Sequence, residues 1–331
     1  MDHARELGEH VLAVRVHVRR PGRHPQGRDD VRADARAPRR PGLLGRRLLP
    51  RAAGRLEPRT APVQRRGRLT VRYLRLLALF VRTELQFELA YRVNFLAELL
   101  SLVIIVVTSV AAVLILFAYT QTMNGWSFPA MLVLLGVFYI VQGVGELAFT
   151  PSFQQFMEQV RLGTLDFVLL KPASSQFLVS LRYFKLSNVA QVALGVIVTA
   201  LGLARLGDEL TLIALGEFAV ALFCGLVLVY VLLLSLSTLA FWFVRVENLL
   251  AVYEAFLDAG RFPVDIYPGW LRLTMSTVIP IGIAITVPAQ AVAGRLEALG
   301  LGLMVLVTIA AWAFARWFWR VGLRSYTGAS A

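Results

Sequence analysis

The sequence predicts an all-α membrane protein with six transmembrane helices. Hydrophobic residues make up 57% of the 331 residues and the mean hydropathy is +0.64, whereas soluble domains contain roughly 45–50% apolar residues. The clearest apolar run extends from Phe95 to Ala118 and carries one charge, on Glu98. At about 1.5 Å per residue, a helix of this length crosses a hydrocarbon layer of about 30 Å. The run therefore predicts the first transmembrane helix.

The N-terminal segment has a different composition. Residues 1–70 hold 18 Arg, 7 acidic residues and all four histidines, whereas residues 71–331 hold 14 Arg, 2 Lys and 14 acidic residues. The segment is rich in Arg and Pro and lacks aromatic residues and periodicity, which predicts disorder. A basic arm that binds nucleic acid or anionic lipid is one interpretation. Because Lys is absent, we favour translated upstream DNA, with the true start near Val71, and expect no nucleic-acid partner.

An amphipathic helix is predicted directly before the first span. From Arg72 to Arg92, apolar residues recur at helical spacing with charged residues between them. A core helix of a soluble protein has a similar pattern. The position immediately before Phe95 favours a helix that lies in the cytoplasmic membrane interface.

Further apolar stretches predict the remaining five spans. They are Met131–Phe149, Val189–Ala204, Ile213–Phe243, a broken region Leu249–Gly294, and Ala298–Trp319. The broken region contains Pro263, Pro268, Pro280 and Pro288, which interrupt any continuous helix. We expect a fifth span that ends near Phe262, followed by short helices that dip back from the outer face.

The charges of the loops predict the orientation. The loop at 119–130 has no charged residue, whereas the loop at 150–186 carries Arg161, Lys171, Arg182 and Lys185. Cytoplasmic loops carry an excess of Lys and Arg. We therefore expect this second loop and both termini in the cytoplasm.

Catalytic chemistry is not supported by the predicted membrane domain. After residue 70 the sequence has no histidine and one cysteine, Cys224, so it offers no Ser/His/Asp set and no metal-ligand spacing. Gly136, Gly143 and Gly145 form no nucleotide-binding motif and are typical of close helix packing. We expect no catalytic residue, no metal and no directly bound cofactor, so any ATP must be bound by another chain.

Two acidic residues fall within predicted spans. Glu98 and Glu146 lie at similar depth on the cytoplasmic side, and a charge in hydrocarbon costs about 2.5–3.5 kcal/mol on insertion scales. One interpretation is a polar entrance to a substrate path. The other is that each carboxylate reaches the interface or pairs with Arg92 or Arg182.

The second loop carries the most informative motif. Its first part, from Pro151, has an amphipathic helical pattern that Gly163 can end, and LDFVLLKP is too short to cross a membrane. The segment RLGTLDFVLLKPASSQF resembles the R-x-G-x-L-D-x-x-L-x-K-P-x-x-x-Q-F loop of type 2 ABC transporter permeases. FPVDIYPGWLR and VPAQAVAGR resemble the family's outer re-entrant helices, and FWRVGLRSYTGASA resembles its C-terminal signature. The resemblance covers residues 71–331.

The resemblance implies a permease subunit of an ATP-binding cassette exporter in a bacterial cytoplasmic membrane. It implies a second permease chain, identical or related, and two cytosolic ATPase subunits that hold ATP and Mg. A cytoplasmic coupling helix of the second loop would dock into a groove on the ATPase. The residues that this implies for coupling are Phe153, Phe156, Arg161, Gly163, Asp166, Lys171 and Pro172. Arg161 and Asp166 are also explained as ordinary charges that flank a membrane.

Other classes of function fit the sequence less well. A secondary transporter driven by an ion gradient needs unpaired acidic residues near the middle of the membrane and usually an internal repeat, and neither is evident. A membrane-embedded transferase or hydrolase lacks the necessary His and Cys. The few polar residues in the spans suit a hydrophobic or amphiphilic cargo.

Overall fold

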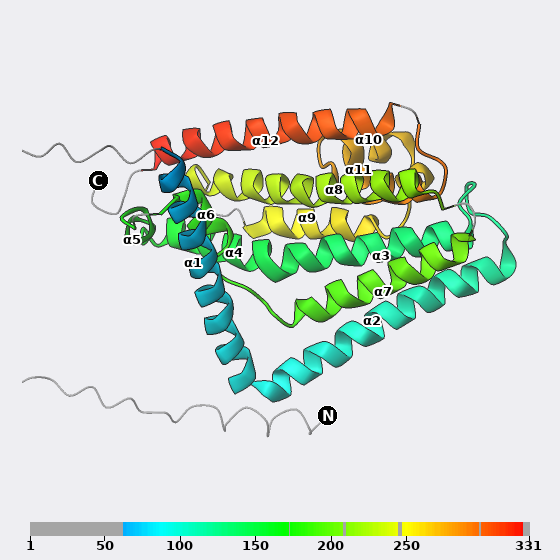
Figure 1. Cartoon of the computed structure of the whole chain (residues 1–331), viewed down its shortest axis with the longest axis horizontal. Coiled ribbons are helices and arrows are strands. Elements are labelled where there is room, and N and C mark those ends of the chain that lie inside the picture. Colours follow the sequence, from blue (N-terminus) through cyan, green and yellow to red (C-terminus); the bar gives the residue numbers. More distant parts are fainter. Residues whose placement is uncertain (1–61, 172, 208–209, 244–246, 298, 327–331) are drawn as a thin grey trace, which may run out of the picture. The chain divides into compact units, whose positions relative to one another are not determined.

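The computed structural model describes residues 62–326, apart from residues 172, 208–209, 244–246 and 298 (Figure 1). In that part of the chain every regular element is a helix, which confirms the predicted all-α class. The prediction of disorder for residues 1–70 lies outside the described residues up to residue 61, whereas residues 62–70 form the start of a helix, contrary to that prediction.

Five described helices are long and apolar enough to cross a membrane. They are α2 (Arg92–Tyr119), a continuous helix over 128–161 that contains α3 (Phe128–Val144), η1 (Gly145–Phe149) and α4 (Thr150–Arg161), α7 (Asn188–Leu206), α8 (Leu212–Thr238) with η3 (Leu239–Phe241), and α12 (Gly300–Ser325). These helices run alongside one another in Figure 1. They confirm five of the six predicted spans.

We call one end of the bundle the basic end. It consists of the loop between α4 and α7 and the C-terminal turn of α12. The opposite end is marked by the loop between α2 and α3. Helix α1 (Pro62–Ala90) crosses the basic end in Figure 1. The backbone of Tyr91 departs from helical geometry and separates α1 from α2. At the basic end the Tyr73 hydroxyl accepts a hydrogen bond of 3.2 Å from the Ser174 amide. Exposed apolar side chains on α1, such as Phe87, fit a helix that lies in a membrane interface.

The helix that contains the second predicted span, Met131–Phe149, does not end there but continues to Arg161. Pro151 has no backbone N–H and its ring crowds the carbonyl four residues earlier, which belongs to Leu147. The chain widens into the π-turn η1 at this place, and the Leu147 carbonyl accepts a hydrogen bond of 2.9 Å from the Lys185 amide instead. A distant segment therefore satisfies the carbonyl that the proline leaves without a helical partner.

Close packing of α3 against α7 depends on glycines. A Cβ atom on Gly136 would lie 2.2 Å from the Thr199 hydroxyl and 2.8 Å from the Gly195 carbonyl oxygen. A Cβ atom on Gly143 would lie 2.8 Å from a Val192 methyl group. Glycine lets the two backbones approach to this distance, which confirms the predicted packing role of Gly136 and Gly143.

The region predicted as a broken fifth span contains α9 (Glu247–Ala259), η4 (Val264–Ile266), α10 (Gly269–Thr277) and α11 (Ile281–Val292). Helix α9 has 13 residues and spans only about 20 Å, less than a hydrocarbon layer of about 30 Å. The residues after α9, up to η4, cover the remaining distance to the opposite end. This follows from the hydrogen bond that the Asp265 carbonyl accepts there from the Asn124 side chain.

Helices α10 and α11 form a pair bent by 92°. Both ends of the pair lie near Asn124, which contacts Asp265 before α10 and accepts hydrogen bonds of 3.3 Å from Arg295 after α11. The middle of the pair packs beside Gly225 of α8. The pair thus leaves and returns to the same end of the molecule, as predicted for re-entrant helices.

Pro288 does not break α11 as predicted, but lies inside it. It leaves the carbonyl of Ala284 without its helical partner. A Cβ atom on Gly225 would lie 2.4 Å from this oxygen, so the carbonyl points at the glycine backbone of α8. The other three prolines of the region stand at helix starts, as N-caps of η4, α10 and α11.

Candidate functional site

The loop that follows α4 begins with a well-defined helix end. Gly163 adopts φ +69°, a left-handed conformation that suits glycine. Its amide donates to the Val160 carbonyl and the Thr164 amide donates to the Gln159 carbonyl, at 3.2 and 2.9 Å. These two bonds form a Schellman motif, which stops the helix. The structure confirms that Gly163 ends the amphipathic helix.

A short helix, α5 (Asp166–Leu169), follows this turn and sorts its side chains into two sets. Leu165 and Val168 are buried and fix the segment to the rest of the protein. Leu162, Phe167 and Leu170 are exposed to 61%, 72% and 82%, and we call these three residues the loop tip. Exposed apolar side chains that gather on one surface are typical of a site that a partner protein or a membrane covers.

The part of the loop after α5 is held by a tyrosine of α8. In α6 (Ser175–Ser180), Gln176 donates to the Tyr230 hydroxyl at 3.1 Å, and the Ser180 hydroxyl lies 3.0 Å from the same atom. Tyr230 was not among the residues predicted from the sequence. It stands in an apolar run without any local signal, and only the fold brings it to the loop.

Phe153 and Phe156, which the resemblance assigned to ATPase contact, lie inside the protein. Their exposed fractions are 0% and 1%. Phe153 packs against Tyr230, and Phe156 packs against Phe241 and Trp319 with ring centroids 5.5 and 5.3 Å away. Both rings therefore connect α4 to α8 and α12 and leave the exposed surface to the loop tip.

The remaining predicted coupling residues lie on or beside the loop. The Arg161 side chain is 49% exposed and donates to both carboxylate oxygens of Glu158 at 2.8 Å. The Asp166 charge lies close to Tyr326, where burial and then this negative charge raise the pKa of the tyrosine hydroxyl. Lys171 is exposed, and partial burial of its ammonium group, together with the Arg182 charge, lowers its pKa. Pro172 lies outside the described residues.

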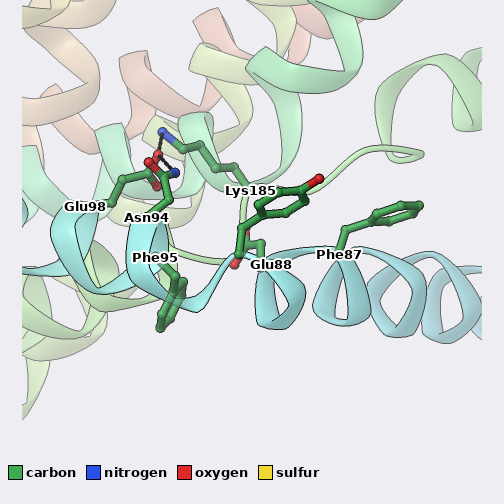
Figure 2. Close-up of a pocket in the computed structure, with 7 residues that line it drawn as sticks. Phe87, Glu88, Asn94, Phe95, Glu98 and Lys185 are labelled. Atoms are coloured by element: carbon green, nitrogen blue, oxygen red, sulfur yellow. Dashed lines mark hydrogen bonds and ion pairs between the residues drawn. The ribbon is translucent and has the colours of Figure 1, made fainter.

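Glu98 faces a cavity of about 430 Å³ at the junction of α1 and α2 (Figure 2). Its carboxylate lies 3.5 Å from the Lys185 ammonium and accepts a hydrogen bond of 3.5 Å from the Asn94 side chain. The predicted pairing with Arg92 or Arg182 is wrong for Glu98, whose partner in the described structure is Lys185. Phe87 and Phe95 line the same cavity, which combines aromatic walls with an ion pair.

A second carboxylate of this cavity holds the start of α7. One oxygen of Glu88 accepts hydrogen bonds from the amides of Leu186 and Ser187 at 2.6 and 3.3 Å. A helix start has amides without helical partners, and a carboxylate stabilises them. In the sequence, Glu88 is one of the charged residues between the apolar positions of the predicted amphipathic helix. Its partners are remote in sequence and could not be identified from it.

Glu146, the other predicted polar residue, lies in the π-turn η1 and is half-buried. It does not line the Glu98 cavity. Its charge interacts with those of Glu254 and Lys185. Lys185 therefore lies near both acidic residues that were predicted as a polar entrance, and it bonds through its backbone to the same π-turn.

The described part of the chain contains one cysteine and no histidine. No group of three or more His, Cys, Asp or Glu residues there could hold a metal ion. Cys224 is a buried thiol within α8. The features that stand out are the exposed apolar loop tip and the cavity with an ion pair.

Comparison with known proteins identifies the family. A family model described as ABC-2 family transporter protein matches residues 102–330. No curated protein and no solved structure matches the chain significantly. The match covers well over half of the chain and includes the loop motif, the bent helix pair and α12. The chain belongs to the ABC-2 family of transporter proteins.

Proposed function

We propose that this chain is the permease subunit of an ATP-driven exporter and that a cytosolic ATPase docks on the loop tip. ABC-2 permeases are membrane transport subunits whose ATPase is a separate chain. In this proposal the basic end faces the cytoplasm of a bacterium, both termini lie there, and a hydrophobic or amphiphilic substrate leaves the cell. ATP and Mg are held by the ATPase chain.

The exposure of the loop tip is the observation that carries this proposal. Leu162, Phe167 and Leu170 project from a segment whose neighbours Leu165 and Val168 are buried. Because the segment is anchored, little conformational freedom would be lost when a partner covers the tip. Exposed apolar groups on an anchored segment are suited to a groove on another protein.

A second permease chain is proposed to cover α2. Only 11% of the apolar window of α2 is buried within this chain, compared with 78% for the helix over 128–161. Exposed residues such as Leu100, Ile104 and Ile115 follow the length of α2. This helix therefore offers a long apolar surface for lipid and for a partner helix.

The test is co-purification with the tagged full-length chain from its native host. We expect a cytosolic ATPase to accompany the wild-type chain and its amount to fall by about tenfold with Phe167→Glu, because an apolar groove does not solvate a new charge. Leu299→Glu is the matched control, since Leu299 is 83% exposed just before α12 at the opposite end. The proposal fails if the wild-type chain retains no ATPase or if Phe167→Glu retains it in full.

A further inference from the structure

A second cavity, of about 470 Å³, lies along the half of α2 that is nearer the opposite end. Its walls come from α2, α3, the loop between them and the segment that follows α9, and they include Val113, Leu116, Met123, Leu135 and Arg261. We call it the Arg261 cavity. Its volume is within the range of roughly 300–1,000 Å³ that small-molecule sites occupy.

The Arg261 side chain, 35% exposed, reaches the middle of the membrane-spanning helix α3. Its guanidinium is 5.3 Å from the centre of the Phe138 ring. At about 1.5 Å per residue, Phe138 lies about 15 Å along α3 from Phe128, near the middle of a hydrocarbon layer of about 30 Å. A charged side chain at this depth is costly, and such residues usually mark a substrate or ion path.

The hydrogen bonds around the cavity leave most of the five N–H donors of Arg261 unused. The Ser109 hydroxyl donates to the Ile105 carbonyl at 2.8 Å and accepts from the Tyr139 hydroxyl at 2.7 Å. Its hydrogen-bond donor is therefore not available to a ligand in the cavity. One terminal nitrogen of Arg261 donates to Asp258 at 3.0 Å. The Nε atom of Arg261 is buried and has no hydrogen-bond partner in the described structure. An unpaired buried donor of a charged group is unfavourable.

We infer that the Arg261 cavity binds an amphiphile with one anionic group, a carboxylate or a phosphate, which accepts a hydrogen bond from Arg261. The apolar body of this ligand packs against Val113, Leu116 and Leu135. A planar guanidinium favours such oxygen acceptors because it can donate two parallel hydrogen bonds. A cationic amphiphile is disfavoured, because it offers the remaining N–H groups of Arg261 no acceptor. That the ligand is the exported substrate rests on the proposed function, whereas its binding does not.

Photolabelling of the full-length chain in phosphatidylcholine nanodiscs tests this inference. The probes are dodecanoic acid with a diazirine on its alkyl chain and the matched dodecanol, which lacks the charge. We expect the acid to label peptides from 109–116 and 261–262, and Arg261→Gln to reduce this labelling by about tenfold. Labelling by the alcohol should change by less than about twofold. Arg272→Gln is the matched control, because Arg272 lies on α10 and donates to the Asp265 carbonyl outside the cavity.

Two further arms identify the source of the anionic group and guard against misfolding. Phosphatidylglycerol added to the discs displaces the acid probe if a lipid phosphate is the natural occupant, whereas displacement by free dodecanoate alone indicates a free carboxylate. Arg261→Lys keeps the charge and should keep most of the labelling. The inference is overturned if the acid and the alcohol label the wild-type cavity equally, or if Arg261→Gln reduces both probes alike. No ATPase is present, so a failure here is distinct from a failure at the loop tip.

Discussion

Substitution of Gly136 by alanine should destabilise the helix bundle although it adds a single methyl group. The new Cβ would lie 2.2 Å from the Thr199 hydroxyl oxygen and 2.5 Å from the Thr199 backbone nitrogen. The hydroxyl can rotate away, but the backbone nitrogen cannot move unless α7 shifts. Overpacking of a filled interior costs about 1–3 kcal/mol, and alanine returns up to about 1 kcal/mol through its higher helix propensity.

Gly216 provides the control, because it also lies within a helix and a Cβ there meets nothing within 4 Å. The gain in helix propensity is common to both substitutions, so the difference between them isolates the contact. We expect Gly136→Ala to be less stable than Gly216→Ala by about 1–3 kcal/mol. The assay is the fraction of the full-length chain that stays monodisperse in one detergent after heating. Equal midpoints for the two variants would refute the close contact between α3 and α7.

Two further predictions concern charges at the basic end. Lys185→Glu should lower the thermal midpoint, and adding Glu98→Lys should restore part of the loss. The restored stability corresponds to up to about 1 kcal/mol, because both side chains are partly exposed. A double variant that is no more stable than Lys185→Glu would contradict the pairing. Burial and then the Glu88 charge raise the pKa of Glu84 above its ordinary value of 4.5, against the opposing effect of Arg182. The folded protein therefore holds the Glu84 proton more tightly than the unfolded chain does. This contribution to stability is present in acid and is lost as the pH rises through the pKa of Glu84 in the folded protein. Glu84→Gln should melt above wild type at pH 7.5, and the gap should close near pH 4.5; a gap that widens in acid would disprove this sign.

Composition and periodicity were sufficient for the parts of the fold that hydrophobic burial decides. Long apolar runs have few alternatives to a membrane-spanning helix, so α2, α7, α8 and α12 lie within a few residues of their predicted ranges. The same holds for the helix end at Gly163, because a left-handed backbone position has a strong local preference for glycine.

Features that depend on tertiary partners could not be predicted. Nothing in the sequence indicated that the second predicted span and the helix after Pro151 are continuous, which they are because Lys185 supplies a partner for the carbonyl that this proline displaces. The helical pattern places Phe153 on an apolar face. It does not determine whether this face packs against a partner chain or against α8. Glu98 had several basic residues within reach along the sequence, and its pairing with Lys185 depends on how the end of the loop returns across the π-turn.

The connection from the loop tip to the membrane interior follows from these contacts. Helices α4 and α3 form one continuous helix, and the hydrogen bond from Lys185 to Leu147 attaches the returning end of the loop to the same helix. The glycine contact at Gly136 joins this helix closely to α7. A displacement of the tip should therefore move α3 and α7 together. Because both cavities are lined by α2, which is mostly unburied within the chain, we expect such a movement to change the space in each of them.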